Sequence, residues 1–268
     1  MIMKNTKALL VISFGTTFPE TRSRTIEAIE TDLQTAFPDR IFYRAFTSGM
    51  VRKKILEQEG LRILSVPEAL EQMQSDGIRD LLVQPTHLLE GAEYASTLDV
   101  IRDRSDLFDQ VRIGRCLMTD QGDIEAMADC LERIFGSLDP GQMLALMGHG
   151  SGRISLPVYD LLNRQFEMDG FSVYCVGTVE FDPGIRPVME KVRQKMPEEV
   201  ILSPLLVVAG DHAVHDMAGS SEDSWKSRIR QMGPRVVCNL KGLGEYQEIR
   251  DLYVEHALQA ERIESRRP

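Results

Sequence analysis

The sequence predicts an α/β fold with two similar, doubly wound domains, each built on a parallel sheet. Two observations lead to this prediction. Apolar runs of strand length alternate with helical patterns along all 268 residues, and this alternation requires right-handed crossovers between parallel strands. The same order of elements then starts again in the second half of the chain. We expect an N-terminal domain over residues 1–138 and a C-terminal domain over residues 139–268, with a break near residues 136–141.

Eight apolar runs predict the core strands. The first, over residues 7–14, is a continuous apolar run closed by Gly15, which is typical of a strand covered on both faces. The others follow at residues 40–46, 78–85, 111–116, 143–147, 171–176, 200–208 and 236–240.

Helical patterns fill most intervals between these strands. In the first helix, Ile26, Ile29 and Leu33 recur at three- and four-residue steps and form one apolar stripe. The sequence from Ser65 to Glu68 is a capping box, which predicts a helix that runs to about residue 75. Further helices are predicted around residues 94–101, 124–134, 161–166, 185–196, 225–232 and 247–260.

The two halves can be laid over each other at short motifs. The matched positions are Phe14-Gly15 with His149-Gly150, Tyr43 with Tyr174, and Pro85 and Gly91 with Pro204 and Gly210. The offsets between matched positions differ, so the chain repeats an architecture with insertions and is not a recent duplication. We expect a ligand at the carboxyl ends of the strands, in the cleft between the halves.

Composition excludes several classes of protein. The chain has 31 basic and 41 acidic side chains and a net charge of −10, which argues against nucleic-acid and membrane partners. The first apolar run is too short to span a bilayer, and no signal-peptide pattern follows it. The four cysteines form neither a CxxC pair nor a zinc spacing, which indicates buried free thiols in a reducing compartment. We therefore expect a cytoplasmic protein, and a homo-oligomer is compatible with the sequence.

Four side chains at predicted strand ends suggest a metal site. His149 and His212 follow the first and third strands of the second half, and Glu180 follows the second. Glu93 stands in the first half where His212 stands in the second, so we expect the two to face each other across the cleft. Imidazole and carboxylate ligands suit cobalt, iron or nickel, and a site with few protein ligands handles a metal in passing.

Anion-binding groups are also expected. Ser13 and Thr16 lie in a loop that can cradle an anion with amides and hydroxyls ahead of a helix. Residues 52–54 are a basic cluster that is either a solvated helix face or a contact for a polycarboxylate. The glycine-rich stretch at His149 lacks the Walker lysine, and no GxSxG nucleophile elbow is present, which argues against a P-loop enzyme and an esterase.

Five stretches of the chain form long, ordered motifs: Ser-Phe-Gly-Thr-Thr, Gln-Pro-Thr-His-Leu-Leu-Glu-Gly-Ala-Glu-Tyr, Met-Gly-His-Gly, Gly-Thr-Val-Glu and Ala-Gly-Asp-His-Ala-Val-His-Asp-Met. Together they resemble one family, the anaerobic sirohydrochlorin cobaltochelatases of the CbiK type. The resemblance extends from residue 7 to about residue 258. It implies a class II chelatase related to ferrochelatase, with two similar α/β domains around a tetrapyrrole. It also implies a lyase of cobalamin biosynthesis that inserts Co2+ into sirohydrochlorin, releases two protons and needs no nucleotide.

The resemblance also implies roles for individual residues. His149, Glu180 and His212 correspond to metal ligands, and His149, His212 and Glu93 to the catalytic group. For the carboxylate arms of the macrocycle we expect Ser13, Thr16, Arg153 and residues 52–54 as contacts. His87 stands where a few relatives use a histidine for heme at a subunit contact, and a structural role is the expected alternative.

Two other functions remain open at this point. Sirohydrochlorin is also the precursor of siroheme, and the same ligands suit Fe2+, so a sirohydrochlorin ferrochelatase is the first alternative; Fe2+ or Ni2+ is a possible metal in vitro. The second alternative is a two-lobed binding protein without turnover. That class usually carries an export signal, which we do not find.

Overall fold

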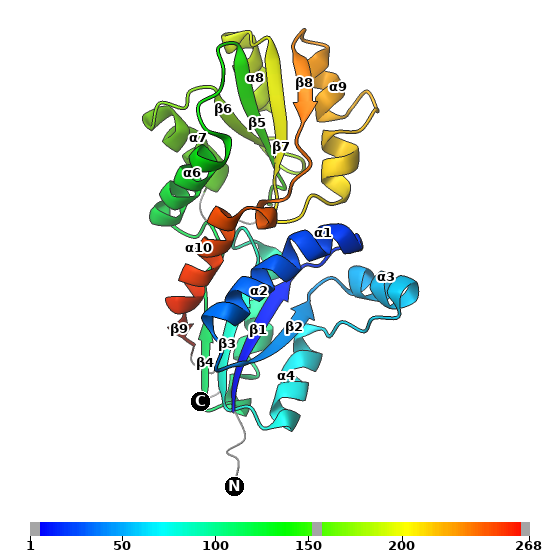
Figure 1. The fold of residues 1–268 in the computed structure, drawn as a ribbon, viewed down its shortest axis with the longest axis vertical. Coiled ribbons are helices and arrows are strands. Elements are labelled where there is room, and N and C mark those ends of the chain that lie inside the picture. The colour runs from blue at the N-terminus through cyan, green and yellow to red at the C-terminus, as the bar shows by residue number, and fades with distance from the viewer. Residues whose placement is uncertain (1–5, 152–156, 264–268) are drawn as a thin grey trace. The chain divides into compact units, whose positions relative to one another are not determined.

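The structure is a computed structural model that describes residues 6–151 and 157–263. The chain divides into two compact units (Figure 1). Unit 1 comprises the described residues up to Leu117 and from Arg250 onward, and unit 2 comprises Met118–Ile249. Each unit is a sheet of parallel strands with helices on both faces, as the sequence predicts, and unit 1 adds one short antiparallel strand.

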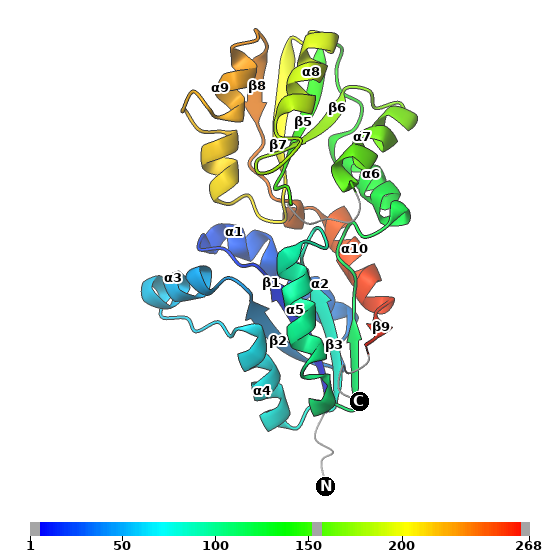
Figure 2. The ribbon, with the colours of Figure 1, turned by 180° about the vertical axis from the view of Figure 1, so that it is seen from behind.

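Unit 1 is built on a five-stranded sheet in the order β2-β1-β3-β4-β9, in which β1 to β4 are parallel and β9 is antiparallel. Helices α2 and α10 lie on one face of this sheet, and α4 and α5 lie on the other (Figures 1 and 2). Its elements are β1 (Lys7–Ser13), α1 (Pro19–Arg24), α2 (Ile26–Ala36), β2 (Ile41–Phe46), α3 (Gly49–Glu59), α4 (Val66–Asp76), β3 (Asp80–Pro85), α5 (Ala92–Arg102), η1 (Ser105–Leu107), β4 (Gln110–Ile113), most of α10 (Gln247–Leu258), and β9 (Glu261–Arg262).

Unit 2 is built on a four-stranded parallel sheet in the order β6-β5-β7-β8. The core on one face joins the sheet to α8, α9 and the short π-helix η2. Helix α7 packs against β6 and against α6. Its elements are α6 (Gln121–Phe135), β5 (Gln142–Gly148), α7 (Val158–Met168), β6 (Tyr174–Thr178), α8 (Arg186–Lys195), β7 (Glu199–Leu205), η2 (Ala213–Met217), α9 (Trp225–Arg230), β8 (Arg235–Cys238) and η3 (Leu243–Glu245).

The parallel strands of both units follow the same order, which confirms the repeat. When the strands are numbered within each unit, their order across the sheet is second, first, third and fourth in both units. Pro85 pairs with Ile12 in unit 1, and Pro204 pairs with Met147 at the same place in unit 2. The predicted match of these prolines is therefore confirmed.

The predicted match of Tyr43 with Tyr174 is wrong by one residue. Tyr43 pairs with Leu10, whereas Tyr174 pairs with Leu144, which lies one residue further from the glycine that closes its strand. Side chains of a strand alternate between faces, so a slip of one residue puts the two tyrosines on opposite faces. Cys175 is the residue of unit 2 that corresponds to Tyr43.

The bounds of the two compact units differ from the expected domain boundary between residues 138 and 139. Helix α6 packs with α7 in unit 2, although it precedes that division. Helix α10 leads the chain back to unit 1, where Arg250 Nε lies 2.6 Å from Asp32 Oδ2 and the Tyr253 hydroxyl donates to the Thr86 carbonyl over 2.8 Å. The division of the chain into domains at residue 138 stays a prediction.

Helix α3 carries the basic cluster of residues 52–54, for which a solvated helix face was one of the two expectations, but its bounds were not predicted. Ser48 caps its start, Gly60 ends it with φ of +67°, and Ile55 is its one buried residue. Because a helix with so little buried surface has no apolar stripe, periodicity could not reveal it.

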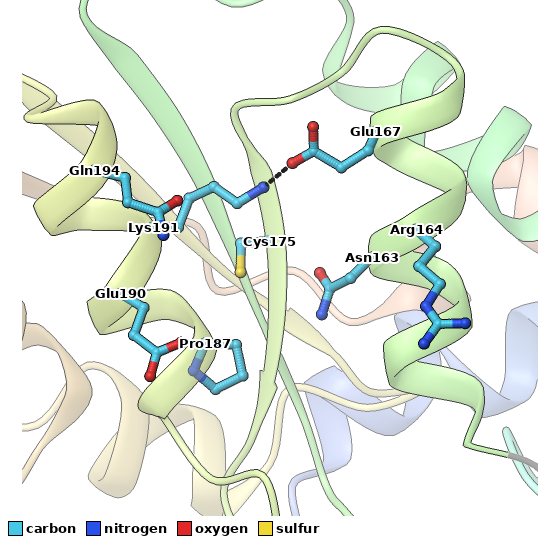
Figure 3. Close-up of a pocket in the computed structure, with 8 residues that line it drawn as sticks. All are labelled: Asn163, Arg164, Glu167, Cys175, Pro187, Glu190, Lys191 and Gln194. Carbon is cyan, nitrogen blue, oxygen red and sulfur yellow. Dashed lines mark hydrogen bonds and ion pairs between the residues drawn. The ribbon is translucent and has the colours of Figure 1, made fainter.

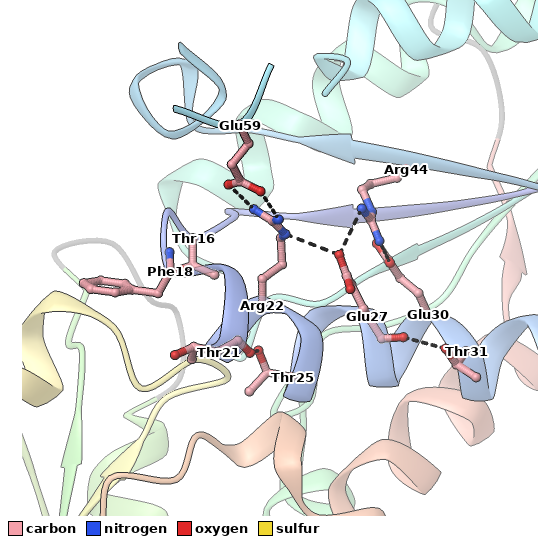
Figure 4. Close-up of polar contacts among 10 residues, drawn as sticks. All are labelled: Thr16, Phe18, Thr21, Arg22, Thr25, Glu27, Glu30, Thr31, Arg44 and Glu59. Atoms are coloured by element: carbon pink, nitrogen blue, oxygen red, sulfur yellow. Dashed lines mark hydrogen bonds and ion pairs between the residues drawn. The ribbon is translucent and has the colours of Figure 1, made fainter. Parts of the chain in front are cut away.

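An ion-pair network fastens α3 to the rest of unit 1 (Figure 4). The Arg22 guanidinium of α1 donates to both carboxylate oxygens of Glu59, the last residue of α3, over 2.9 and 2.5 Å. It also donates to Glu27 over 3.3 Å, and Glu27 pairs in turn with Arg44. The side chain of Arg22 is only 7% exposed, so this charge is held inside the protein by its carboxylate partners.

The four cysteines agree with the expectation of free thiols. All four cysteines are free thiols; Cys116, Cys130 and Cys175 are buried, and Cys238 is half-buried. In the part of the chain that the structure describes, no helix is both long and apolar enough to cross a bilayer.

Candidate metal-binding site

Three of the predicted ligands come together at the carboxyl ends of the unit 2 strands. One ligand atom from each of His149, Glu180 and His212 lies within 4.8 Å of the others. The imidazole rings of His149 and His212 stand edge to face, with their centroids 5.1 Å apart. His212 Nε2 lies 3.9 Å from Glu180 Oε1. Among residues 6–151 and 157–263 this is the one such group of three.

The turn after β5 fixes the backbone of His149 against that of Glu180. The N–H of Glu180 donates to the His149 carbonyl over 2.8 Å. Gly150 follows with φ of +92°, and a Cβ atom there would lie 1.9 Å from the Glu180 carbonyl oxygen. Only glycine fits this position, because a side chain would be both strained and in collision with the neighbouring loop.

Tyr159 of α7 packs against the same turn through its hydroxyl and its ring. Its hydroxyl accepts the N–H of Gly150 over 3.1 Å, and its ring leaves no room for a side chain on Gly148. Burial raises the pKa of Tyr159 to about 12, so the hydroxyl is neutral at physiological pH. Sequence analysis did not single out Tyr159, since a tyrosine on an apolar helix face is indistinguishable from a core residue.

The Nδ1 atoms of both imidazoles have hydrogen-bond partners within the protein. His149 Nδ1 lies 3.0 Å from the Gly150 carbonyl oxygen, and His212 Nδ1 lies 2.7 Å from Asp216 Oδ2. Since a carbonyl and a carboxylate only accept hydrogen bonds, the N–H at Nδ1 of each ring donates, and Nε2 is the ring nitrogen left for a metal. This tautomer is the one that binds a metal through Nε2.

The π-helix η2 places the Asp216 carboxylate within hydrogen-bond distance of His212 Nδ1. His212 immediately precedes η2, and Asp216 stands four residues later in it. Single π-turns are rare and occur often at functional sites. Asp216 was missed by sequence analysis, although the spacing of four residues after a candidate ligand was a usable signal.

Unit 1 carries the remaining predicted site residue, Glu93. The Thr47 hydroxyl donates to Glu93 Oε1, and His87 Nε2 lies 4.0 Å from the same oxygen. The His87 side chain is 10% exposed, neither of its ring nitrogens has a hydrogen-bond partner among the described residues, and burial lowers its pKa to about 4. The imidazole is thus neutral at pH 7. The expected facing of Glu93 and His212 stays a prediction.

The predicted anion-binding hydroxyls are used within unit 1. Ser13 is 1% exposed, and its Oγ accepts the Thr86 hydroxyl over 2.8 Å. Thr16 is 6% exposed, and its Oγ1 accepts the Phe18 N–H over 3.3 Å. Their part in holding an anion stays a prediction, and Arg153 lies outside the described residues.

A further histidine and the basic residues of α3 have partners outside the cluster. His215 is exposed and pairs with Asp211 over 3.0 Å. In α3, Arg52 pairs with Glu68 over 3.4 Å, and exposed Lys53 lies 3.8 Å from its neighbour Glu57.

A cavity of about 260 Å³ lies over edge strand β6 of unit 2, between α7 and α8 (Figure 3). Asn163 exchanges two hydrogen bonds with the Val176 backbone, and Lys191 pairs with Glu167. Burial raises the pKa of the Cys175 thiol to about 12, which removes its reactivity as a nucleophile. These contacts close the sheet edge and leave the cavity without a reactive group. The lining residues are Asn163, Arg164, Glu167, Cys175, Pro187, Glu190, Lys191 and Gln194.

Known proteins match the chain over nearly its whole length. The family model described as cobalt chelatase (CbiK) matches residues 7–262. The sirohydrochlorin cobaltochelatase of Salmonella typhimurium is 35% identical over 254 residues, which cover 95% of this chain and 96% of the relative. The sirohydrochlorin cobaltochelatase CbiKC of Nitratidesulfovibrio vulgaris is 29% identical over 256 residues, 93% of this chain and 89% of that protein.

Solved structures share the fold. SirB from Bacillus subtilis, solved with Fe3+, superposes with a TM-score of 0.63 at 14% identity and covers 94% of each chain. The structure of CbiX, described as the terminal enzyme for biosynthesis of siroheme in denitrifying bacteria, superposes with a TM-score of 0.53 at 18% identity and covers 94% of this chain and 98% of that one. At these identities the likeness concerns the fold alone.

Proposed function

The chain belongs to the cobalt chelatase (CbiK) family, and we propose that His149, Glu180 and His212 hold the Co2+ that it inserts into sirohydrochlorin. The activity is that of a sirohydrochlorin cobaltochelatase, a step of cobalamin biosynthesis. One observation carries the assignment of the site: three ligand atoms converge within 4.8 Å, and the Nδ1 atoms of both histidines are engaged elsewhere, which leaves Nε2 for the metal.

Metal capture follows from the chemistry of the three side chains. Two neutral imidazoles and one carboxylate suit a borderline divalent ion such as Co2+. The carboxylate of Glu180 offsets one unit of the metal charge, while three protein ligands leave coordination positions open. Such a site binds the substrate metal and releases it to a stronger ligand, since a closed set of four would retain it.

Insertion replaces two protons of the macrocycle by the metal ion. Two pyrrole N–H bonds break, their electron pairs stay on nitrogen, and the four ring nitrogens then bind Co2+. A base must receive each proton. We assign this task to Glu93, whose carboxylate is held in place by the Thr47 hydroxyl and is 40% exposed, so that it takes up one proton, passes it to water and then takes up the second. His149 and His212 cannot ligate the metal and accept a proton at Nε2 at the same time.

Three finer points belong to the same proposal. The reaction needs no nucleotide, because the exchange of two protons for a metal ion by a tetradentate ligand is driven by the stability of the product. Fe2+ and Ni2+ replace Co2+ in vitro, since imidazole and carboxylate ligands do not separate these ions. The free thiols fit the reducing conditions of a cytoplasm.

The test combines metal insertion with metal binding. The absorbance of sirohydrochlorin is followed anaerobically with wild type and with Co2+, Fe2+ or Ni2+ at matched concentrations. Titration calorimetry then measures the affinity for Co2+ without the macrocycle. We expect His149→Ala and His212→Ala to lose at least 100-fold in insertion rate and to bind Co2+ far more weakly.

His215→Ala is the matched control, because His215 lies close in sequence but pairs with Asp211 outside the cluster. It should keep the wild-type rate and affinity. A His149→Ala protein that inserts cobalt within twofold of wild type overturns the assignment of the site. Iron insertion clearly faster than cobalt insertion moves the activity to siroheme synthesis, and ring binding without insertion makes the chain a binding protein.

A further inference from the structure

One histidine of unit 1 is buried in a way that lowers the stability of the fold. The His87 side chain is 10% exposed, and neither ring nitrogen has a hydrogen-bond partner among the described residues. Burial keeps the imidazole neutral, so the ring has one N–H to donate and one lone pair with which to accept. A buried polar group without a partner is unfavourable, and native proteins keep few of them. An apolar side chain would give a more stable protein here unless the imidazole has a task.

Unit 2 has an apolar side chain at the corresponding position. Leu206 corresponds to His87, because each stands two residues after the matched proline of its sheet. The His87 carbonyl accepts the Leu117 N–H, and the Leu206 carbonyl accepts the Leu243 N–H. Leu206 packs against the apolar core of unit 2. The architecture therefore accepts leucine at this position and does not itself require a histidine.

The side chain near His87 that has a functional role is Glu93. His87 Nε2 lies 4.0 Å from Glu93 Oε1, and the same oxygen accepts the Thr47 hydroxyl. A small rotation of the Glu93 side chain, which is 40% exposed, brings Nε2 and Oε1 to hydrogen-bond distance. Hydrogen bonds of a catalytic group are often long before substrate binds and shorten in the complex.

The imidazole of His87 is itself held in place. Its ring stands edge to face against the ring of Tyr94, with the centroids 6.0 Å apart and an angle of 61° between the planes. Tyr94 is 7% exposed and follows Glu93 directly in α5. The His87 backbone is held by the hydrogen bond from Leu117 over 3.2 Å. Since the ring and the backbone of His87 are fixed, the Glu93 carboxylate is the group that moves to form the contact.

The repeat supports a role for this pair. Glu93 corresponds to His212, because each stands two residues after a glycine whose carbonyl accepts the N–H of the residue four positions later. The imidazole of His212 is held by the carboxylate of Asp216, and Leu206 has no polar group to offer it. In unit 1 the functional side chain is a carboxylate, which needs a donor, and a donor stands at the position of Leu206.

We propose that His87 is a positioning residue for Glu93: its Nε2–H donates to Glu93 Oε1 and, together with the Thr47 hydroxyl, fixes the orientation of the carboxylate. This inference rests on the proposed function, which makes Glu93 the base. With two donors on Oε1, Oε2 is the oxygen that accepts a pyrrole proton. The pyrrole N–H bond breaks, its electron pair stays on nitrogen, and Oε2 passes the proton to water before it takes up the second. His87 keeps its own proton throughout.

The test measures kcat and KM for anaerobic insertion of Co2+ into sirohydrochlorin. His87→Leu should fold, since unit 2 has leucine at this position, and should lose about 10-fold to 100-fold in kcat, because a misplaced base reacts slowly. Its KM values for Co2+ and sirohydrochlorin should stay within threefold of wild type, because the inference gives His87 no contact with either. His87→Gln should keep kcat within threefold of wild type, because its amide places an N–H near the position of Nε2.

A double variant separates positioning from a general effect on the fold. Glu93→Gln removes the base, so His87→Leu added to Glu93→Gln should not lower kcat further. A purely structural role would lower kcat by the same factor in both backgrounds. His256→Leu is the matched control, because His256 is 4% exposed and lies in α10, on the opposite face of the unit 1 sheet from α5 (Figures 1 and 2). It should keep the wild-type kcat.

The outcomes distinguish this inference from the proposed function. A His87→Leu protein with wild-type kcat overturns the inference and leaves the proposed function standing, and so does a His87→Gln protein as slow as His87→Leu. An equal loss from His87→Leu in the wild-type and Glu93→Gln backgrounds does the same. A Glu93→Gln protein that inserts cobalt at the wild-type rate removes the base from the proposed function, and this inference fails with it.

Discussion

His212 Nδ1 lies 2.7 Å from Asp216 Oδ2, so a carboxylate one turn further along the chain holds the second imidazole of the metal site. The contact fixes the tautomer and the rotation of the ring about its Cβ–Cγ bond. It also makes Nε2 a stronger donor, because the negative charge behind the ring favours electron donation to the metal. His149 has a weaker partner for the same purpose, the carbonyl of Gly150.

We predict that Asp216→Asn weakens Co2+ binding about 10-fold to 100-fold. Asparagine keeps the size of the side chain but removes the charge, and its amide can donate to Nδ1 and so favour the wrong tautomer. The affinity is measured by titration calorimetry with Co2+ alone. Asp211→Asn is the control, because Asp211 pairs with His215 in the same segment. Equal affinities of the two variants would remove Asp216 from the site.

A second prediction concerns Gly150, whose φ is +92° and whose added Cβ would lie 1.9 Å from the Glu180 carbonyl. Gly150→Ala should displace Glu180 from the ligand set and abolish tight Co2+ binding. Gly170→Ala is the matched control, because φ is +86° there and nothing lies within 4 Å of the added methyl group.

The control separates backbone strain from collision. Gly170→Ala should lower the free energy of unfolding by about 1–2 kcal/mol and leave Co2+ affinity unchanged. Gly150→Ala should lose both stability and affinity, as measured by urea unfolding and by titration calorimetry. If Gly150→Ala retains wild-type affinity, the turn does not position the ligands.

The third prediction concerns pH and the buried His87. Its pKa is about 4 in the folded protein and about 6.5 in an unfolded chain. Between these values the unfolded state binds a proton that the folded state does not, so the free energy of unfolding falls as the pH falls. Between pH 7 and pH 5 the loss is about 2 kcal/mol.

His87→Leu should remove that slope. Leucine is a suitable replacement because Leu206 occupies the corresponding place in unit 2. The Leu206 carbonyl accepts the Leu243 N–H, just as the His87 carbonyl accepts the Leu117 N–H. Urea unfolding of wild type and His87→Leu at pH 7 and at pH 5 gives, for each protein, the change in the free energy of unfolding between the two pH values. Identical pH dependence in wild type and variant would show that His87 titrates normally.

Much of this architecture follows from the sequence because it depends on short-range patterns. The capping box at Ser65 and Glu68 forms as predicted, and the predicted strands lie within a few residues of the observed ones. The convergence of His149, Glu180 and His212 could be expected because β5, β6 and β7 are adjacent and parallel, so their carboxyl ends meet at one edge.

Features that depend on packing could not be derived in the same way. The one-residue slip between Tyr43 and Tyr174 is set by strand register, which a motif match does not contain. The return of α10 to unit 1 depends on contacts such as that of Arg250 with Asp32, residues far apart in the chain. The role of Tyr159 depends on a turn that comes close only in the folded protein.

The last prediction concerns the clamp between α1 and α3. Glu59→Ala removes both carboxylate contacts of the nearly buried Arg22 guanidinium. We expect the free energy of unfolding to fall by about 2 kcal/mol, because a charged donor loses its main partner. Lys53→Ala in the same helix should change it by less than about 0.5 kcal/mol, since its ion pair is exposed.

The clamp should also weaken in acid. The Arg22 guanidinium lowers the pKa of Glu59 below its usual value of 4.5, so the contribution of the pair is complete at neutral pH and declines as the pH falls through the lowered pKa. Urea unfolding at pH 7 and pH 3.5 measures this decline as a smaller difference between wild type and Glu59→Ala at the lower pH. If the difference is the same at both values, the Glu59 charge does not stabilise the fold, and the packing of its side chain accounts for the whole effect.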